Sequence, residues 1–336
     1  QTPVVTESSV FYRTGGYETP KFAVDKTNGE IVENTSNKVD YTAHTEKGKA
    51  IAMFNANDGE EIWQVKTDEF VAEQPTVGSA STYFVCIDGT VKALSNADGN
   101  EQWSVSLNTK VHGKPSLTSS GLYVASENRM LSKLDKESGE KVWSFESTEI
   151  ENKAYRYFSA PIENNGILYI GSASKYLYAL NAETGDLIWK TELSDWIRSA
   201  PVVVNEVIYV ATLDGKIHAV KDNGQDAEVM FTQKVNEHGF TADLEGTENG
   251  ILAVGRDLIL YSISPKTGYT NWKHGVLNGT FVDGQFFAAG WSGGLLGSPT
   301  IVDDVVYIGG PDGFVNALNA DTGKEIWRFE TNSTTS

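Results

Sequence analysis

The sequence of 336 residues contains one cysteine, Cys86, so an intramolecular disulfide is excluded. It has no apolar run approaching the roughly 18 residues of a membrane-spanning helix, and no stretch with convincing helical periodicity. Positive charge is also scarce, because 27 Lys and Arg side chains stand against 45 Asp and Glu, giving a net charge of −18. Nucleic acid and anionic membrane surfaces are therefore poor partners for the molecule as a whole.

The chain does contain an eleven-residue motif, which repeats with a period of about 40 residues. Two copies are ALNAETGDLIW and ALNADTGKEIW, and in every clear copy a glycine stands four residues before the tryptophan. The six tryptophans of the clear copies are Trp63, Trp103, Trp143, Trp189, Trp272 and Trp327. A seventh, degraded copy places Phe231 near the tryptophan position. The sequence therefore contains seven units.

Prolines mark a second fixed position in the unit. Four units share one spacing from proline to motif glycine: Pro75 to Gly99, Pro115 to Gly139, Pro161 to Gly185 and Pro299 to Gly323. The spacing is one residue shorter from Pro201 to Gly224 and much longer from Pro20 to Gly59. The sixth unit has GFTADL (239–244) instead. Because the first residue of a strand need not donate a ladder hydrogen bond, we expect each proline to open a strand.

Each unit is predicted to hold four short strands, which we call A to D in chain order. An apolar, β-branched run such as VIYVAT forms strand B, a turn often containing Asp-Gly leads to strand C, and strand D ends at the tryptophan. Radial packing of such sheets predicts an all-β fold, a seven-bladed β-propeller of four-stranded antiparallel blades. We expect one domain over 1–336, with flexible tails at about 1–10 and 330–336, and a fifth blade that is the least regular.

The tryptophans have a structural role in this interpretation. Each indole covers the seam to the next blade and donates its N–H to a backbone carbonyl, and the motif glycine leaves room for the ring. Cys86, in the strand-like run YFVCID, is expected to be a small buried residue rather than a nucleophile.

The repeated phrase resembles the tryptophan-docking repeat of the PQQ-like β-propeller superfamily, over 20–327. That superfamily contains quinone-dependent dehydrogenases and BamB-like outer-membrane assembly scaffold proteins. The resemblance implies adjacent cysteines and a Ca²⁺ site for a dehydrogenase, and this chain has one cysteine and no Asp-rich loop typical of calcium sites. We therefore predict a protein that is not an enzyme and has no cofactor and no metal. The resemblance favours a periplasmic, cell-surface or secreted location, with a signal peptide removed before Gln1.

Candidate binding residues lie in the longer connections. The D-to-A links, from tryptophan to proline, are equally long before Pro75, Pro115 and Pro201, longer before Pro161 and longest before Pro299. In a propeller these links and the B-to-C turns share one face, here called the D-to-A face, whereas an insertion between Lys21 and Asp40 is expected on the opposite face. Four of the six arginines map to the D-to-A face: Arg129, Arg156, Arg198 and Arg256. The predicted partner-binding residues are Tyr155, Arg156, Tyr157, Trp196, Ile197, Arg198 and Trp291.

Three functions remain open at this point. The first is a binding and assembly scaffold that docks a protein partner through the D-to-A face, and the segment LSDWIRSAPVV resembles the link that BamB-like proteins use for this purpose. The second is recognition or lyase-type cleavage of an acidic glycan, with His112 or His238 and Tyr155 or Tyr157 as base and acid. The third is self-assembly as a surface or filament subunit. Glycosylation at Asn34, Asn278 or Asn332 is compatible with an exterior location.

Overall fold

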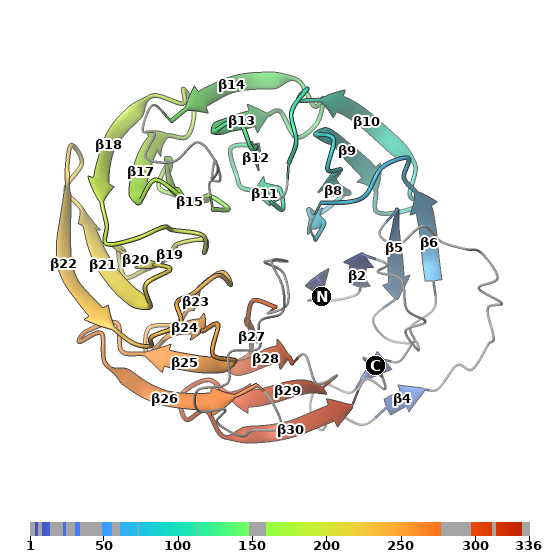
Figure 1. Ribbon diagram of the computed structural model, residues 1–336. Helices are drawn as coiled ribbons and strands as arrows, with labels where there is room; N and C mark the ends of the chain where they lie inside the picture. The colour runs from blue at the N-terminus through green and yellow to red at the C-terminus, as the bar shows by residue number, and fades with distance from the viewer. Residues whose placement is uncertain are drawn as a thin grey trace.

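The computed structural model describes residues 49–55, 61–72, 74–111, 113–147, 159–276, 297–310 and 314–330, and the backbone of strands within 4–33. Seven four-stranded antiparallel sheets stand around a ring, which confirms the seven-bladed β-propeller (Figure 1). No described residue is helical. In each sheet the first strand lies toward the centre of the ring and the last lies at the rim (Figure 1).

Blades two to four follow the predicted unit. The second blade contains β7 (Thr76–Val77), β8 (Ser81–Val85), β9 (Thr90–Ser95) and β10 (Glu101–Ser106). The third contains β11 (Ser116–Leu117), β12 (Leu122–Ala125), β13 (Met130–Leu134) and β14 (Lys141–Glu146). The fourth contains β15 (Ile162–Asn164), β16 (Ile167–Gly171), β17 (Tyr176–Asn181) and β18 (Leu187–Glu192).

Blades five to seven repeat the same order. The fifth contains β19 (Val202–Val204), β20 (Val207–Ala211), β21 (Lys216–Asp222) and β22 (Ala227–Lys234). The sixth contains β23 (Glu245–Gly246), β24 (Ile251–Val254), β25 (Ile259–Ile263) and β26 (Thr270–Gly275). The seventh contains β27 (Thr300–Val302), β28 (Val305–Gly309), β29 (Phe314–Asn319) and β30 (Glu325–Glu330).

Proline opens strand A in five blades, as predicted. Strands β7, β11, β15, β19 and β27 each begin one residue after a proline. In the sixth blade β23 begins directly after Leu244, the last residue of the segment that replaces the proline. The proline position is therefore the entry to the innermost strand.

The first blade differs from the expectation. Its sheet consists of β1 (Val4–Val5), β2 (Ser9–Arg13), β5 (Ala50–Asn55) and β6 (Glu61–Lys66), with a separate pair, β3 (Ala23–Val24) and β4 (Ile31–Glu33), between β2 and β5. Strands A and B therefore precede Pro20 and occupy part of the segment expected to be a flexible tail. The insertion lies between strands B and C of this sheet, whereas its expected place on the opposite face requires a connection between strands A and B. The apolar, β-branched character of 4–5 and 9–13 explains the pairing. The expected C-terminal tail follows β30 and lies outside the described residues.

The motif tryptophans pack over the motif glycine of the next blade. A Cβ on Gly99 would lie 2.9 Å from Cδ2 of Trp63, and the same relation joins Trp103, Trp143 and Trp272 to the following blade. The indole N–H donates to the carbonyl three residues before that glycine. The acceptors are Asn96, Lys136, Ala182 and Ala320, at 3.0, 3.1, 3.3 and 3.0 Å.

Two seams depart from this pattern. Phe231 pairs with Ala219, as Trp189 pairs with Ala179, and its ring covers Gly268. The fifth sheet is complete and has its register shift at the usual place, so the expectation that this blade is the least regular is wrong. The indole N–H of Trp189 donates instead to the Asp222 carboxylate, at 3.0 Å, rather than to a carbonyl.

Candidate docking face

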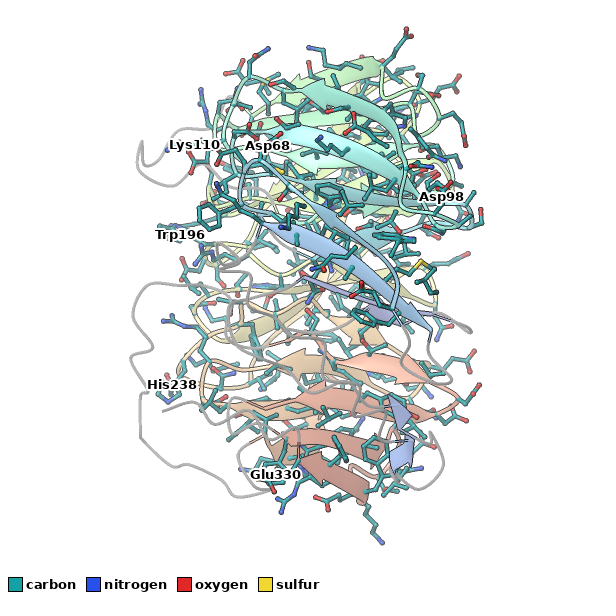
Figure 2. All side chains as sticks on the ribbon, turned by 90° about the vertical axis from the view of Figure 1, so that its right-hand side faces the viewer. Asp68, Asp98, Lys110, Trp196, His238 and Glu330 are labelled. Atoms are coloured by element: carbon teal, nitrogen blue, oxygen red, sulfur yellow. The ribbon has the colours of Figure 1, made fainter. Side chains whose placement is uncertain are left out.

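The D-to-A links lie together on one side of the molecule. Figure 2 shows Asp68, Lys110, Trp196 and His238 along one edge, with Asp98, from a C-to-D turn, at the other. The first four belong to different links. The structure therefore brings these links together on one face.

The link before Pro201 is attached to the blades by buried contacts. Ile197 is only 1% exposed and packs in the cluster between the fourth and fifth blades. Its backbone N–H donates to the carbonyl of Ser172 at 3.0 Å. This corrects the assignment of Ile197 as a partner contact, because a buried side chain positions the link and presents no surface. The apolar character of Ile197, between an aromatic and a basic residue, is the sequence signal for its burial.

The neighbours of Ile197 are the ones at the surface. Trp196 is half-buried, and its carbonyl accepts a hydrogen bond from the Leu213 N–H at 2.9 Å. Arg198 is exposed. Ala200 donates its N–H to the Asp243 carboxylate at 2.8 Å. Backbone hydrogen bonds to three different segments therefore hold this link in one conformation.

A buried histidine lies beneath the same link. Nε2 of His218 lies 3.2 Å from the hydroxyls of both Ser194 and Thr212, and Nδ1 lies 2.9 Å from Thr232 Oγ1. Burial lowers the pKa of His218 to about 4, against the opposing effect of Asp214 and with a smaller contribution from Lys216. The imidazole is therefore neutral at pH 7. Nothing in the strand pattern KIHAV singles this histidine out, so sequence analysis missed it.

An ion pair joins the inner ends of several blades on this face. The Lys114 amine lies 2.5 Å from Asp243 Oδ2, although the two residues belong to the third and sixth units. The Asp243 N–H donates to the hydroxyl of Ser298, before the seventh blade, at 3.0 Å. Burial raises the pKa of Glu245, and the nearby Asp243 adds to this while Lys114 opposes it. These non-covalent contacts join the segments that precede the inner strands of the third, sixth and seventh blades.

His238 belongs to a second half-buried group. Asn236 Oδ1 accepts the N–H groups of His238 and Gly239, at 2.8 and 2.7 Å. Burial raises the pKa of Asp257, whereas hydrogen bonding from Tyr261 and the charge of His238 lower it. The other partners expected for an acid and base pair lie outside the described residues. The same holds for most of the predicted partner-binding set: Tyr155, Arg156, Tyr157 and Trp291, and also His112.

The single cysteine of the chain is a buried core residue. Cys86 is 2% exposed, and burial raises the pKa of its thiol to about 11, which confirms the small buried residue expected there. The adjacent cysteines that the resemblance implies are missing from the sequence. In the described ranges, no three His, Cys, Asp or Glu side chains gather as metal ligands. Nor does that part of the chain form a helix long and apolar enough to cross a bilayer.

Comparison with known proteins gives one family and several relatives. The family model described as outer membrane protein assembly factor BamB matches residues 46–162, 157–281 and 255–336. The quinoprotein alcohol dehydrogenase PedH from Pseudomonas putida is 35% identical over 75 residues, which are 22% of this chain and 10% of that protein. The chain therefore spans only about a tenth of that curated relative.

Solved structures share the fold. BamB from Moraxella catarrhalis has a TM-score of 0.64 and 19% identity, covering 84% of this chain and 80% of that chain. The computationally designed protein Ika8 has a TM-score of 0.69 and 12% identity, covering 94% and 89%. A quinohemoprotein alcohol dehydrogenase from Pseudomonas putida HK5 has a TM-score of 0.60 and 13% identity, covering 84% and 63%. Taken with the repeated tryptophan seams, the family model shows that this chain belongs to the BamB family of PQQ-like β-propellers.

Proposed function

We propose that this protein is a non-catalytic binding and assembly scaffold of the cell envelope or exterior, which docks a protein partner on its D-to-A face. The observation that carries the proposal is the link before Pro201. Buried Ile197 fixes this link, so that Trp196 and Arg198 stand on either side of a rigid anchor. Aromatic residues and arginine are the side chains most often found at the energetic centre of interfaces.

Family membership supports the same function. The matching family is named for outer membrane protein assembly, and the BamB of Moraxella catarrhalis shares the fold. A rigid propeller that presents loops is suited to hold a partner without chemistry of its own. The same relationship supports a periplasmic, cell-surface or secreted location. Fold similarity to dehydrogenases carries less weight, because one fold serves unrelated functions.

Site-specific photo-crosslinking in native envelope tests the face. A benzophenone amino acid at position 196 or 110 should give a discrete adduct with a protein partner, whereas one at position 98, on the opposite side (Figure 2), should not. Arg198→Ala and Trp196→Ala should weaken capture of that partner by roughly 5- to 150-fold, the range for interface anchors, with an unchanged melting temperature. Ile197→Ala should instead lower the melting temperature, because it removes a buried side chain.

Three outcomes would reject the proposal. Adducts only from position 98 would move the site to the opposite face. Equal partner capture by Arg198→Ala and the wild type would remove the link from the interface. Release of unsaturated sugars from a uronate polysaccharide, lost in His238→Ala, would favour the lyase alternative.

A further inference from the structure

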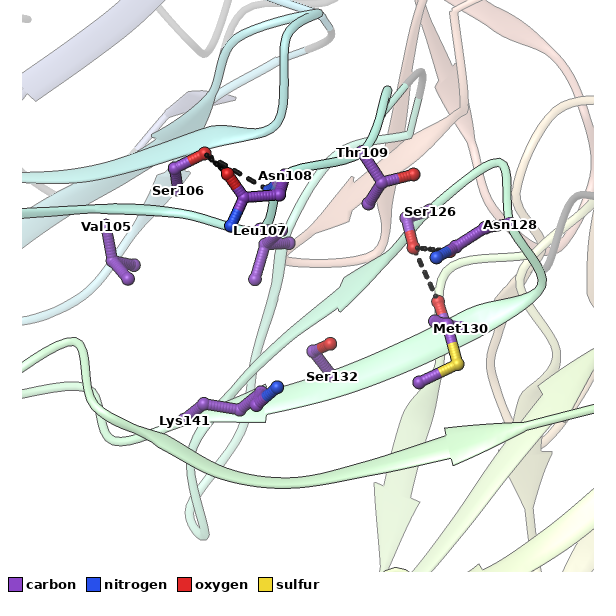
Figure 3. A pocket seen from close by; sticks show the side chains of 10 residues that line it. All are labelled: Val105, Ser106, Leu107, Asn108, Thr109, Ser126, Asn128, Met130, Ser132 and Lys141. Atoms are coloured by element: carbon purple, nitrogen blue, oxygen red, sulfur yellow. Dashed lines mark hydrogen bonds between the residues drawn. The ribbon is translucent and has the colours of Figure 1, made fainter.

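A cavity of about 370 Å³ lies in the seam between the second and third blades. Its apolar wall includes Val105, Leu107 and Met130, and its polar lining includes Ser132 and Lys141. Figure 3 shows strands β10 and β14 on either side, with the Ser126–Asn128 turn at one end. The cavity reaches the D-to-A face through this turn, yet it is separate from the link that carries Trp196.

The next seam shows why this one is open. Phe145, two residues after Trp143, packs against Tyr178 of the fourth blade, with ring centroids 5.5 Å apart. The Tyr178 hydroxyl is hydrogen-bonded to Ser147 at 2.8 Å. The repeat places Val105 and Ser132 at the positions of these two rings. The cavity is therefore the space of an aromatic pair that this seam does not supply.

Every other described seam has at least one larger side chain at these positions. The pairs are Val65 and Lys92, Thr191 and His218, Gln233 and Tyr261, and His274 and Asn316. The seam between blades two and three combines two small residues. The gap is open to solvent, and an apolar occupant would restore the packing that larger side chains give the other described seams.

The lining contains two polar side chains, a buried serine and an exposed lysine. Ser132 is 5% exposed, and within the described chain its hydroxyl has no hydrogen bond, although it points into the cavity (Figure 3). The Lys141 amine extends toward Ser132 (Figure 3) and forms no ion pair with any described residue. Both groups face the cavity and are open to hydrogen bonding, so a ligand that enters it can bond to them.

From this geometry we propose that the cavity binds an aromatic ring carrying a carboxylate. The ring takes the place of the missing side-chain pair, between Val105, Leu107 and Met130. The carboxylate pairs with the Lys141 amine, and a polar ring substituent bonds to the Ser132 hydroxyl. None of the lining residues belongs to the link before Pro201, so the site is separate from that link, although it opens on the same D-to-A face.

Titration of the full chain with 4-hydroxyphenylacetate, followed by amide NMR, tests the proposal. Saturable shifts are expected within 105–109 and 126–132. The neutral analogue 2-(4-hydroxyphenyl)ethanol should bind about tenfold more weakly. Lys141→Gln should lose this preference and bind both compounds alike. Lys110→Gln, a matched change outside the cavity lining, should bind as the wild type does.

A variant whose own side chains fill the cavity provides a second test. The triple variant V105F/L107S/S132Y carries the side chains of the next seam, and it should lose at least about tenfold in affinity while melting no lower than the wild type. The proposal is overturned by the absence of saturable shifts in the wild type, or by Lys141→Gln retaining the preference for the acid. If the triple variant fails to fold, the Lys141→Gln comparison still decides the question.

Discussion

The indole of Trp143 lies against the α-carbon of Gly185 in the next blade, so closely that a methyl group there would be 2.6 Å from Cδ2 of the ring. Gly185 also has a φ of +79°, which disfavours any other residue. Both the contact with Trp143 and the positive φ therefore require glycine at position 185. A second glycine, Gly224, has the positive φ without such a contact, so comparing the two positions separates the effects. Gly224 has a φ of +91° but nothing within 4 Å of the same methyl position.

We predict that Gly185→Ala destabilises the protein more than Gly224→Ala. The change at Gly224 costs only the left-handed backbone conformation, roughly 1–2 kcal/mol. The change at Gly185 adds overpacking of the seam, typically about 1–3 kcal/mol. Urea denaturation of the two variants measures the difference. Equal losses would show that Trp143 moves aside without cost.

The Asp222 carboxylate serves as acceptor for two buried side chains of the fourth blade. Tyr169 donates its hydroxyl to Oδ2 at 2.6 Å, and Trp189 donates its indole N–H to Oδ1 at 3.0 Å. Asp222→Ala leaves both donors unpaired and is expected to cost about 2–4 kcal/mol. Asp226→Ala, in the same exposed turn, should change the free energy of unfolding by less than about 0.5 kcal/mol. Similar changes in the free energy of unfolding for the two variants would contradict a role of Asp222 in the seam.

Phe231→Trp is expected to stabilise the fifth blade. The carbonyl of Pro265 occupies the place of the indole acceptor in the other seams, and it accepts the Tyr209 hydroxyl at 2.9 Å. In the seam of Trp103 one carbonyl accepts both the tyrosine and the indole. The added bond should contribute about 0.5–1.5 kcal/mol, seen as a higher melting temperature. Phe231→Leu is the control and should lower the melting temperature. A lower melting temperature for the Phe231→Trp variant would mean that the seam lacks room for the indole.

The protein should lose stability in mild acid through the titration of His218. Its pKa is about 4 in the folded protein and near 6.5 when unfolded, so the unfolded chain binds more protons between these values. The contribution of His218 to the free energy of unfolding is complete above pH 6.5 and is lost as the pH falls toward about 4. The full difference corresponds to roughly 3 kcal/mol.

His218→Gln isolates this effect, because glutamine keeps a donor and an acceptor but does not titrate. Its free energy of unfolding should decrease less than that of the wild type between pH 7 and pH 4. Parallel curves for the two proteins would show that carboxylates alone cause the acid sensitivity.

The fold could be predicted from the sequence because its signals are local and repeated. A glycine and a tryptophan four residues apart close the unit, and a proline at a nearly constant distance upstream opens it in five blades. The first blade was misplaced because Pro20 stands much further from Gly59 than the other prolines do from their glycines, and that unequal spacing was the sign of an insertion. Short runs such as Val4–Val5 carry too little pattern to identify a strand on their own.

The site was less accessible to sequence analysis. Trp196 and Arg198 were found as aromatic and basic residues in a link, yet whether Ile197 beside them is buried depends on its packing against Gly171 of the fourth blade, distant in sequence. The cavity depends on Val105 and Ser132, which lie in different blades and are ordinary strand residues individually. Only the register between two sheets shows that together they replace a pair of rings.

The strand order of the ring has a consequence for how the molecule opens. Each described sheet is built from one continuous stretch of chain, the first from within 4–66 and the seventh from 300–330, so no strand is shared between the two ends. Among the described residues the circle is in this sense a linear series of blades, and no strand of the first sheet is hydrogen-bonded to a strand of the seventh. A force applied to the two termini should therefore separate the first blade from the seventh before any sheet loses a strand, and the remaining blades should then yield one neighbour at a time, as in a solenoid.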